Sequence, residues 1–270
     1  MISVKNLTFN YRETLPPALH DISFELKPGE VLGVVGSSAA GKTTLAYALA
    51  GLTKNHFPGN TQSGTIRFDN HEGFPLASRI GFVFQDVGIQ LSGVTGTIEE
   101  EIAFSLEQFG MPTSTIENRI EEQLDLFQLQ ALKHRSPKTL SGGETQLLAI
   151  ASETAKHPEI LILDEPTQSL DVRNITRLAS AIKKLKQTTA IVVTEECVNL
   201  TGAVADRILF LEDGNQRYCG PLPGLVNSGL DLSSLNLPEW MEAQKQLQRP
   251  LVNVSYRESV KWFRELRSSN

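Results

Sequence analysis

The chain has 270 residues, of which 40% are hydrophobic, and a formal net charge of −6; it is long enough to bury a substantial core. The acidic balance argues against nucleic-acid binding as the main function, because proteins of that class carry a basic face. The two cysteines, Cys197 and Cys219, form neither a disulfide framework nor a metal-binding pattern, which favours a reducing compartment.

Apolar runs alternate with amphipathic stretches along most of the chain, which indicates strands alternating with helices. Strands are predicted at 3–11, 21–30, 31–36, 63–68, 79–85, 159–166 and 189–195. Helices are predicted at 43–51, 98–109, 117–129, 143–156 and 172–186, and a hairpin at 206–218 around Asp213-Gly214. This order predicts an α/β fold with a largely parallel sheet, helices on its faces and a helical insertion over about 97–157.

The segment GSSAAGKT follows a predicted strand and opens a predicted helix, which is the setting in which this pattern binds phosphate. Backbone N–H groups of such a loop point inward and cradle phosphate oxygens. Lys42 is expected to place its charge on the terminal phosphates, and the Thr43 hydroxyl to ligate Mg²⁺. An ordinary glycine-rich turn is the alternative. The residues predicted to hold the nucleotide here are Gly36, Ser37, Ser38, Ala39, Ala40, Gly41, Lys42, Thr43 and Thr44.

A second apolar strand, ILILDEP, ends in two acidic residues. Asp164 is expected to hold the Mg²⁺ shell and Glu165 to polarise an attacking water. A polar strand end without such a role is the alternative. Together with the phosphate loop, this strand predicts ATP and Mg²⁺ as cofactors.

The segment LSGGETQ, from Leu140 to Gln146, lies between these two motifs. Alone it could be a helix cap. In this order the three motifs resemble those of the ATP-binding-cassette ATPases, over about residues 2–219. The resemblance implies a P-loop NTPase (RecA-like) core, an antiparallel β-subdomain, an inserted helical subdomain at about 97–157, and a small C-terminal extension at 220–270.

The same resemblance assigns further site residues. Gln85 matches the glutamine of the family's Q-loop, with a catalytic and a metal-binding role, and Asp171 lies in its D-loop. Tyr11 matches the aromatic residue that stacks on adenine, although it could be an ordinary strand aromatic. The family pairs two subunits head to tail, so a partner's ATP would contact Ser141, Gly142, Gly143 and Glu144.

The segment 88–112 is similar to the ATPases of energy-coupling-factor vitamin and metal importers. That similarity implies a second ATPase, a transmembrane coupling protein and a substrate-binding membrane protein. No stretch of about 18 apolar residues and no secretory leader is seen, so we expect the chain to sit peripherally on the cytoplasmic face of the membrane. The tail is expected to be helical at 238–248 and 256–267 and to serve dimerisation or packing. A regulatory or membrane-surface role through Trp262, Phe263 and Leu266 is the alternative.

Three positions depart from the family pattern. Ala39 replaces a usual glycine, at a cost of roughly 1 kcal/mol if the backbone there needs a positive φ. Leu147 stands where an arginine commonly follows the glutamine. The strand TAIVVTE runs into Glu195 and Glu196 where relatives carry a histidine that contacts the γ-phosphate. Counting back from 205–207 favours Glu196 as the replaced position, and counting from the threonine favours Glu195.

We prefer Glu196, and we expect this chain to be the degenerate half of an asymmetric pair that binds ATP and hydrolyses it poorly. The retained Glu165 argues against that interpretation, and both acids could simply face solvent. The other functions considered are a conventional importer ATPase acting as a homodimer, a soluble cassette protein acting on ribosomes or DNA, and a subunit that holds ATP only as a structural ligand.

Overall fold

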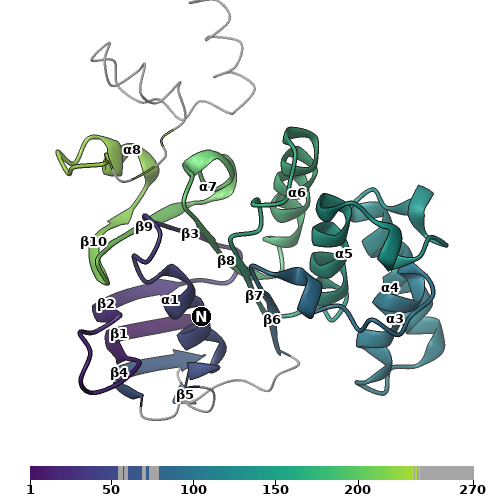
Figure 1. Cartoon of the computed structure of the whole chain (residues 1–270), viewed down its shortest axis with the longest axis horizontal. Coiled ribbons are helices and arrows are strands. Elements are labelled where there is room, and N and C mark those ends of the chain that lie inside the picture. Colours follow the sequence, from purple (N-terminus) through teal and green to yellow (C-terminus); the bar gives the residue numbers. More distant parts are fainter. Residues whose placement is uncertain are drawn as a thin grey trace, which may run out of the picture.

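One mixed β-sheet runs through the protein (Figure 1). The computed structural model describes residues 1–53, 57, 60–68, 71–72, 79–233, 235 and 237. The strands in these residues are β1 (Ile2–Asn10), β2 (Leu19–Leu26), β3 (Val31–Val35), β4 (Thr61–Phe68), β5 (His71–Glu72), β6 (Ile80–Val83), β7 (Ile160–Asp164), β8 (Ala190–Glu195), β9 (Arg207–Glu212) and β10 (Asn215–Gly220). They are ordered β5-β4-β1-β2-β10-β9-β3-β8-β7-β6.

The helices of the described residues flank this sheet. They are α1 (Lys42–Ala50), α3 (Ile98–Glu107), α4 (Thr113–Leu126), α5 (Gly142–Thr154), α6 (Val172–Leu185), α7 (Val198–Val204) and α8 (Leu222–Val226). Short 3-10 turns lie at Val87–Ile89, Gln130–Leu132 and Pro137–Thr139. In this part of the chain, no helix is both long and apolar enough to cross a bilayer.

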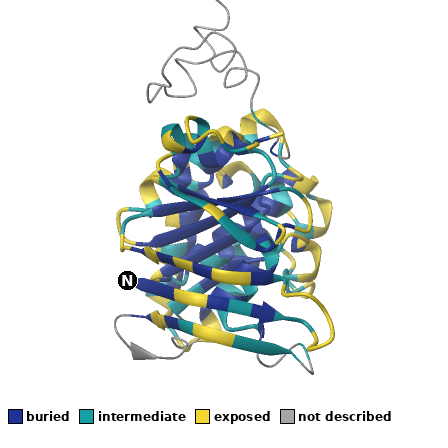
Figure 2. Ribbon diagram, turned by 90° about the vertical axis from the view of Figure 1, so that its left-hand side faces the viewer, coloured by how far each residue is buried: buried dark blue, intermediate teal, exposed yellow. Residues whose placement is uncertain are grey.

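The sheet has a parallel half and an antiparallel half. Strands β9, β3, β8, β7 and β6 pair in parallel, as the sequence predicts. Strands β1, β2, β4 and β5 pair antiparallel, in agreement with the antiparallel β-subdomain that the family resemblance implies. Strands β3, β7 and β8 are buried at every position, whereas β2 alternates between buried and exposed residues (Figure 2). The difference arises because helices cover both faces of the parallel strands.

Successive residues of β7 and β8 enter two different cores. Ile160, Ile162 and Val192 pack with α1 and the antiparallel strands. Leu161 and Leu163 pack on the opposite face with α5, α6 and α7. This alternation follows from the period of two along a strand, and it explains why these segments read as unbroken apolar runs.

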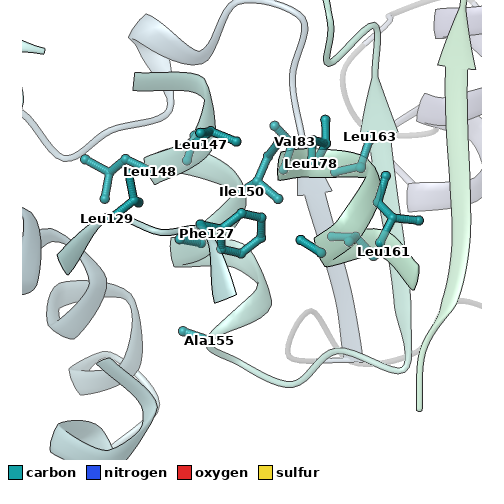
Figure 3. Close-up of a cluster of buried hydrophobic side chains, with 14 of the residues drawn as sticks. Val83, Phe127, Leu129, Leu147, Leu148, Ile150, Ala155, Leu161, Leu163 and Leu178 are labelled. Carbon is teal, nitrogen blue, oxygen red and sulfur yellow. The ribbon is translucent and has the colours of Figure 1, made fainter. Parts of the chain in front are cut away.

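The segment between β6 and β7 forms the helical insertion that the sequence predicts. Helices α3 and α5 each begin with a capping box, Thr97 with Glu100 and Ser141 with Glu144. The side chain of Phe127 is fully buried among residues of α5 and the loop after α4 (Figure 3). The insertion therefore shares one continuous core with the β7–β8 face of the sheet.

The described part of the tail packs on the sheet. Leu225 of α8, Leu232 and Leu235 are buried against Val35 and Phe210. The helices predicted at 238–248 and 256–267, with Trp262, Phe263 and Leu266, lie outside the described residues. Helix α7 was not predicted, because seven residues carry too little of a helical period to distinguish them from a loop.

We expect Phe127→Ala to lower the free energy of unfolding by about 3–5 kcal/mol, because it leaves a cavity in a closely packed core. Phe109→Ala is the matched control, since the Phe109 side chain is 43% exposed and should cost under about 1 kcal/mol. Urea denaturation of both variants measures the difference. Equal losses would show that Phe127 does not occupy the core of the insertion.

Candidate nucleotide-binding site

The loop between β3 and α1 has the backbone shape that the phosphate-loop pattern predicts. Gly36 lies so close to the Leu211 carbonyl that a Cβ atom would collide with it. Ala39 adopts φ 63°, so the predicted strain of roughly 1 kcal/mol applies to this position. Gly41 adopts φ 101° and begins α1, whose N-terminus faces the loop. A loop of this shape at the start of a helix is suited to bind an anion through its backbone N–H groups.

Lys42 lies at the centre of the site, and only 4% of its surface is exposed. Its ammonium donates to the carbonyl oxygens of Gly36 at 3.1 Å and Ser37 at 2.9 Å. It also lies 3.2 Å from the Glu165 carboxylate and 3.7 Å from that of Glu196. The charge of this lysine is therefore shared between its own loop and two acidic residues from distant segments.

Asp164 ends β7 and is fully buried. Its Oδ1 accepts hydrogen bonds from the hydroxyl groups of Thr43 at 3.2 Å and Thr194 at 2.6 Å. Burial raises the pKa of Asp164, although both hydroxyl groups oppose the rise. Its Oδ2 is buried without a hydrogen-bond partner among the described residues. A free carboxylate oxygen beside a hydroxyl group is a ligand set that fits Mg²⁺.

Glu165 follows Asp164 with a backbone φ of 47°, a conformation that non-glycine residues adopt mainly where the surrounding structure enforces it. Its N–H donates to the Thr194 hydroxyl at 3.0 Å. Its Oε2 accepts from the side-chain amides of Gln85 at 3.1 Å and Gln168 at 2.9 Å. The carboxylate is thus held in one orientation by Lys42 and two amides.

A cleft of about 360 Å³ opens in front of these groups. Tyr11 forms its far wall: its hydroxyl group shares a 2.8 Å hydrogen bond with Thr44, and its ring packs edge-on against Phe9 and Phe57. The cleft is lined by Tyr11, Ala18, Ser38, Ala39, Gly41, Lys42, Thr43, Thr44, Gln85, Glu165, Gln168 and Glu196. The structure therefore brings six of the nine predicted loop residues to one site with Gln85, Glu165, Glu196 and Tyr11. Gly36, Ser37, Ala40 and Asp164 do not line the cleft.

The two adjacent acids after β8 have different surroundings. Glu195 is 4% exposed, and its carboxylate accepts from the Thr167 N–H at 3.2 Å and the Thr167 hydroxyl at 2.9 Å. Glu196 is 39% exposed at its side chain, lines the cleft and faces Lys42. Of the two positions that the sequence left open, Glu196 is the one beside the phosphate loop.

The LSGGETQ segment lies outside this cleft in the described structure. Ser141 caps α5, and its N–H donates to the Glu144 carboxylate at 2.8 Å, which lowers the pKa of Glu144. Gly142 and Gly143 at the start of α5 face Ser169 and the Asn174 side chain. Asp171 caps α6 by accepting from the Asn174 N–H at 2.8 Å. Leu147 is fully buried in the shared core of α5 and the sheet.

Sequence reasoning missed three residues that organise the site. Thr194 links Asp164 to the Glu165 backbone, Gln168 orients Glu165, and Thr167 binds Glu195. Thr194 could have been found as the one hydroxyl within the apolar run AIVVT. Nothing in the local sequence distinguishes Gln168 or Thr167, because Gln168 reaches Glu165 through the turn after β7 and Thr167 meets Glu195 only through the pairing of the sheet.

The turn between β9 and β10 supports the phosphate loop from behind. The Gly214 N–H donates to the Ala40 carbonyl at 3.2 Å, and the Gly214 carbonyl accepts from His20 N–H at 2.8 Å. Gly214 has φ 75°, and a Cβ atom there would lie 2.8 Å from the Ala18 carbonyl oxygen. A side chain at this position would therefore displace the loop.

We expect Gly214→Ala to weaken ADP binding by about tenfold or more, because the displaced turn no longer supports Ala40. Gly110→Ala is the matched control: Gly110 also has a positive φ, 65°, but a Cβ atom would meet nothing within 4 Å. Both variants should lose about 1 kcal/mol of stability from backbone strain. Calorimetric titration with ADP separates them, and equal affinities would contradict a supporting role for the turn.

The buried carboxyl of Glu195 predicts a pH dependence of stability. Burial raises its pKa to about 8, against the opposing hydrogen bonds from Thr167. Between the ordinary pKa of 4.5 and this value, the folded protein holds a proton that the unfolded chain has released. The contribution of the Glu195 carboxyl to the free energy of unfolding is therefore fully present below pH 4.5. It is lost as the pH rises toward 8, by up to about 1.4 kcal/mol per pH unit.

Glu195→Gln should therefore flatten the fall of unfolding free energy between about pH 5 and 8, as measured by denaturation at several pH values. Thr167→Val is the companion variant: it removes a hydrogen bond that lowers the pKa of Glu195, so the fall should persist and extend to higher pH. Identical profiles for wild type and Glu195→Gln would show that the Glu195 carboxyl does not titrate in this range.

Comparison with known proteins agrees with this geometry. A family profile described as "ABC transporter" matches residues 19–168. The energy-coupling factor transporter ATP-binding protein EcfA1 of Lactiplantibacillus plantarum is 32% identical, and the match covers 100% of this chain and 98% of the relative. A solved structure of cbiO1 from Clostridium perfringens, described as part of the ABC transporter complex cbiONQ, superposes with a TM-score of 0.73 at 26% identity over 84% of this chain and 90% of that one.

Another group of relatives is longer. A putative ABC transporter ATP-binding protein of Methanosarcina mazei is 34% identical over 263 residues, which are 94% of this chain and 52% of the relative. The chain thus spans about half the length of several curated relatives that it matches. The family profile, the near full-length match to EcfA1 and the site geometry lead to one conclusion: this chain belongs to the ABC transporter family, as an ATP-binding protein that resembles the ATP-binding subunits of energy-coupling factor transporters.

Proposed function

We propose that this protein is an ATP-binding subunit of an energy-coupling-factor type importer, in which ATP-driven closure of two cassettes powers transport. One observation carries the proposal. The phosphate loop, Asp164 and Glu165 converge on one cleft in a chain that matches an EcfA1 protein over nearly the whole length of both. In the described residues no helix could span a membrane, so the proposal assigns the transmembrane coupling protein and the substrate-binding membrane protein to other chains, with this one on the cytoplasmic face.

The cleft supports a division of roles toward ATP. The loop residues from Gly36 to Thr44 would hold the phosphates, and Tyr11 would contact the adenine. Thr43, Gln85 and Asp164 would hold Mg²⁺, and the unpartnered Oδ2 of Asp164 supports this assignment. Bound Mg²⁺ neutralises negative charge on the phosphates. Glu165 is held toward the cleft by Lys42 and two amides, which suits a residue that polarises an attacking water.

A second group of residues would serve a partner subunit. The start of α5 is capped and contributes no residue to the lining of the chain's own cleft, which suits binding of a partner's phosphates. The residues proposed for this role are Ser141, Gly142, Gly143, Glu144 and Asp171. On this proposal residues 1–219 form the nucleotide-binding domain, with the helical subdomain at about 97–157, and residues 220–270 pack or dimerise.

The partner is proposed to be a non-identical ATPase, because this chain's own site is altered. Glu196 stands beside Lys42 at the position proposed for the missing histidine. Two unit charges about 4 Å apart repel by roughly 4 kcal/mol at an effective dielectric near 20. The side chain is 39% exposed, so solvent screening reduces this penalty to a rate loss of about ten- to a hundredfold.

A homodimeric importer ATPase is the second candidate. It is favoured by Glu165, which is present and fully oriented by Lys42, Gln85 and Gln168. A site that never hydrolyses ATP has no need to hold this carboxylate in place. The two candidates differ in the turnover of the isolated chain.

We expect the purified chain to hydrolyse ATP slowly, and Glu196→His to raise the rate by about tenfold or more by replacing a repelling charge with a hydrogen-bond donor. Glu195→His is the matched control, because Glu195 is buried against Thr167 and does not line the cleft. Steady-state phosphate release, with the oligomeric state checked by light scattering, measures both. Fast turnover by a wild-type homodimer that Glu196→His leaves unchanged would favour the second candidate.

A further inference from the structure

The charges around the cleft are unbalanced in the absence of nucleotide. Lys42 is the one cationic side chain that lines the cleft within the described ranges, whereas two carboxylates, Glu165 and Glu196, line it too. Both lie within 4 Å of the Lys42 ammonium, at 3.2 and 3.7 Å. Asp164 adds a third acidic side chain behind Thr43. A polyphosphate must therefore share a single cation with acids that are already in place.

The two carboxylates beside Lys42 are not equivalent. Glu165 is 7% exposed and accepts from two side-chain amides as well as from Lys42. Its position is fixed by these bonds. Glu196 lies just beyond the end of β8, its side chain is 39% exposed, and it meets the site through Lys42. Glu196 is therefore the acid whose removal changes the charge at the lysine without disturbing the hydrogen bonds of Glu165.

The Glu196 carboxylate would repel the third phosphoryl group of a bound nucleotide more than the rest of it. In a loop of this type, backbone N–H groups cradle the α- and β-phosphates and the lysine reaches the β- and γ-phosphates. The third phosphoryl group thus adds negative charge at the ammonium end of Lys42, where Glu196 lies. A diphosphate takes the loop's N–H groups and avoids most of the repulsion.

We propose that Glu196 makes this site discriminate against nucleoside triphosphates, so that it holds ADP more tightly relative to ATP than a site without this carboxylate. The inference rests on the proposed function, because it requires the phosphate loop to bind nucleotide. It differs from the proposed loss of turnover, since it concerns binding of the ground state.

The test is the ratio of the ADP and ATP dissociation constants, measured by calorimetric titration in EDTA, where hydrolysis does not interfere, and again with Mg²⁺. Three forms of the full chain are compared: wild type, Glu196→Gln and Glu195→Gln. The titrations are made at pH 9, above the raised pKa of Glu195, so that both variants remove one unit of negative charge from adjacent positions, but only Glu196 lines the cleft. We expect Glu196→Gln to shift the ratio toward ATP by about tenfold, chiefly through tighter ATP binding, and Glu195→Gln to leave the ratio within about twofold.

The outcomes separate the inference from the proposed function. A ratio in Glu196→Gln equal to that of wild type, with both nucleotides bound, would overturn the inference alone. The same shift in both variants would also overturn it, because it would mean that net charge acts without a local contact. If neither ADP nor ATP bound to wild type or to Glu196→Gln, the proposed function would fail together with the inference. Differential scanning fluorimetry of the three forms without nucleotide checks that all are folded.

Discussion

The burial of a single ammonium group, that of Lys42, constrains most of this structure. A buried cation is costly unless nearby groups compensate its charge and its hydrogen-bond donors. Here two carbonyl groups of its own loop and two carboxylates supply that compensation. They come from the ends of β3, β7 and β8, which are neighbours in the sheet. The parallel arrangement meets this need because it brings the carboxyl ends of these strands to one edge.

The pairing register of β3, β7 and β8 determines which side chains reach the site. Asp164 pairs with Thr194, and Val35 pairs with Glu195. The last paired residue of β8 is therefore Glu195, and Glu196 is the first residue free to turn toward the phosphate loop. A slip of one residue would exchange their environments, since side chains alternate along a strand.

The sequence predicts those parts of the molecule whose structure is determined by neighbouring residues in the chain. The apolar runs of β3, β7 and β8 and the glycines of the loop are dictated by burial on both faces and by close backbone approach, so they are readable from the chain. The helical pattern predicted the insertion, whereas the antiparallel strands were expected only from the resemblance to the ATP-binding-cassette ATPases. The sequence left two candidates for the position of the missing histidine, with a preference for Glu196. Counting back from residues 205–207 gave Glu196, and counting from the threonine gave Glu195. Gln168 and Thr167 were missed because the sequence shows neither the turn that brings Gln168 back to Glu165 nor the pairing of β7 with β8 that places Thr167 beside Glu195.

Two surfaces of this chain would have different roles in a pair of cassettes. The start of α5 would contact the partner's nucleotide, and the cleft would hold the chain's own. The start of α5 is built without compromise: Ser141 and Glu144 cap each other, and Leu147 is fully packed. Two of the three departures lie instead at the chain's own cleft, Ala39 at a strained φ and Glu196 at the lysine, whereas the third, Leu147, is buried in the core. In a pair of identical chains both sites would carry these departures. With a different partner, the intact surface of this chain would meet an unaltered cleft, and only one of the two sites would be affected. The location of the departures therefore fits an asymmetric pair better than a symmetric one.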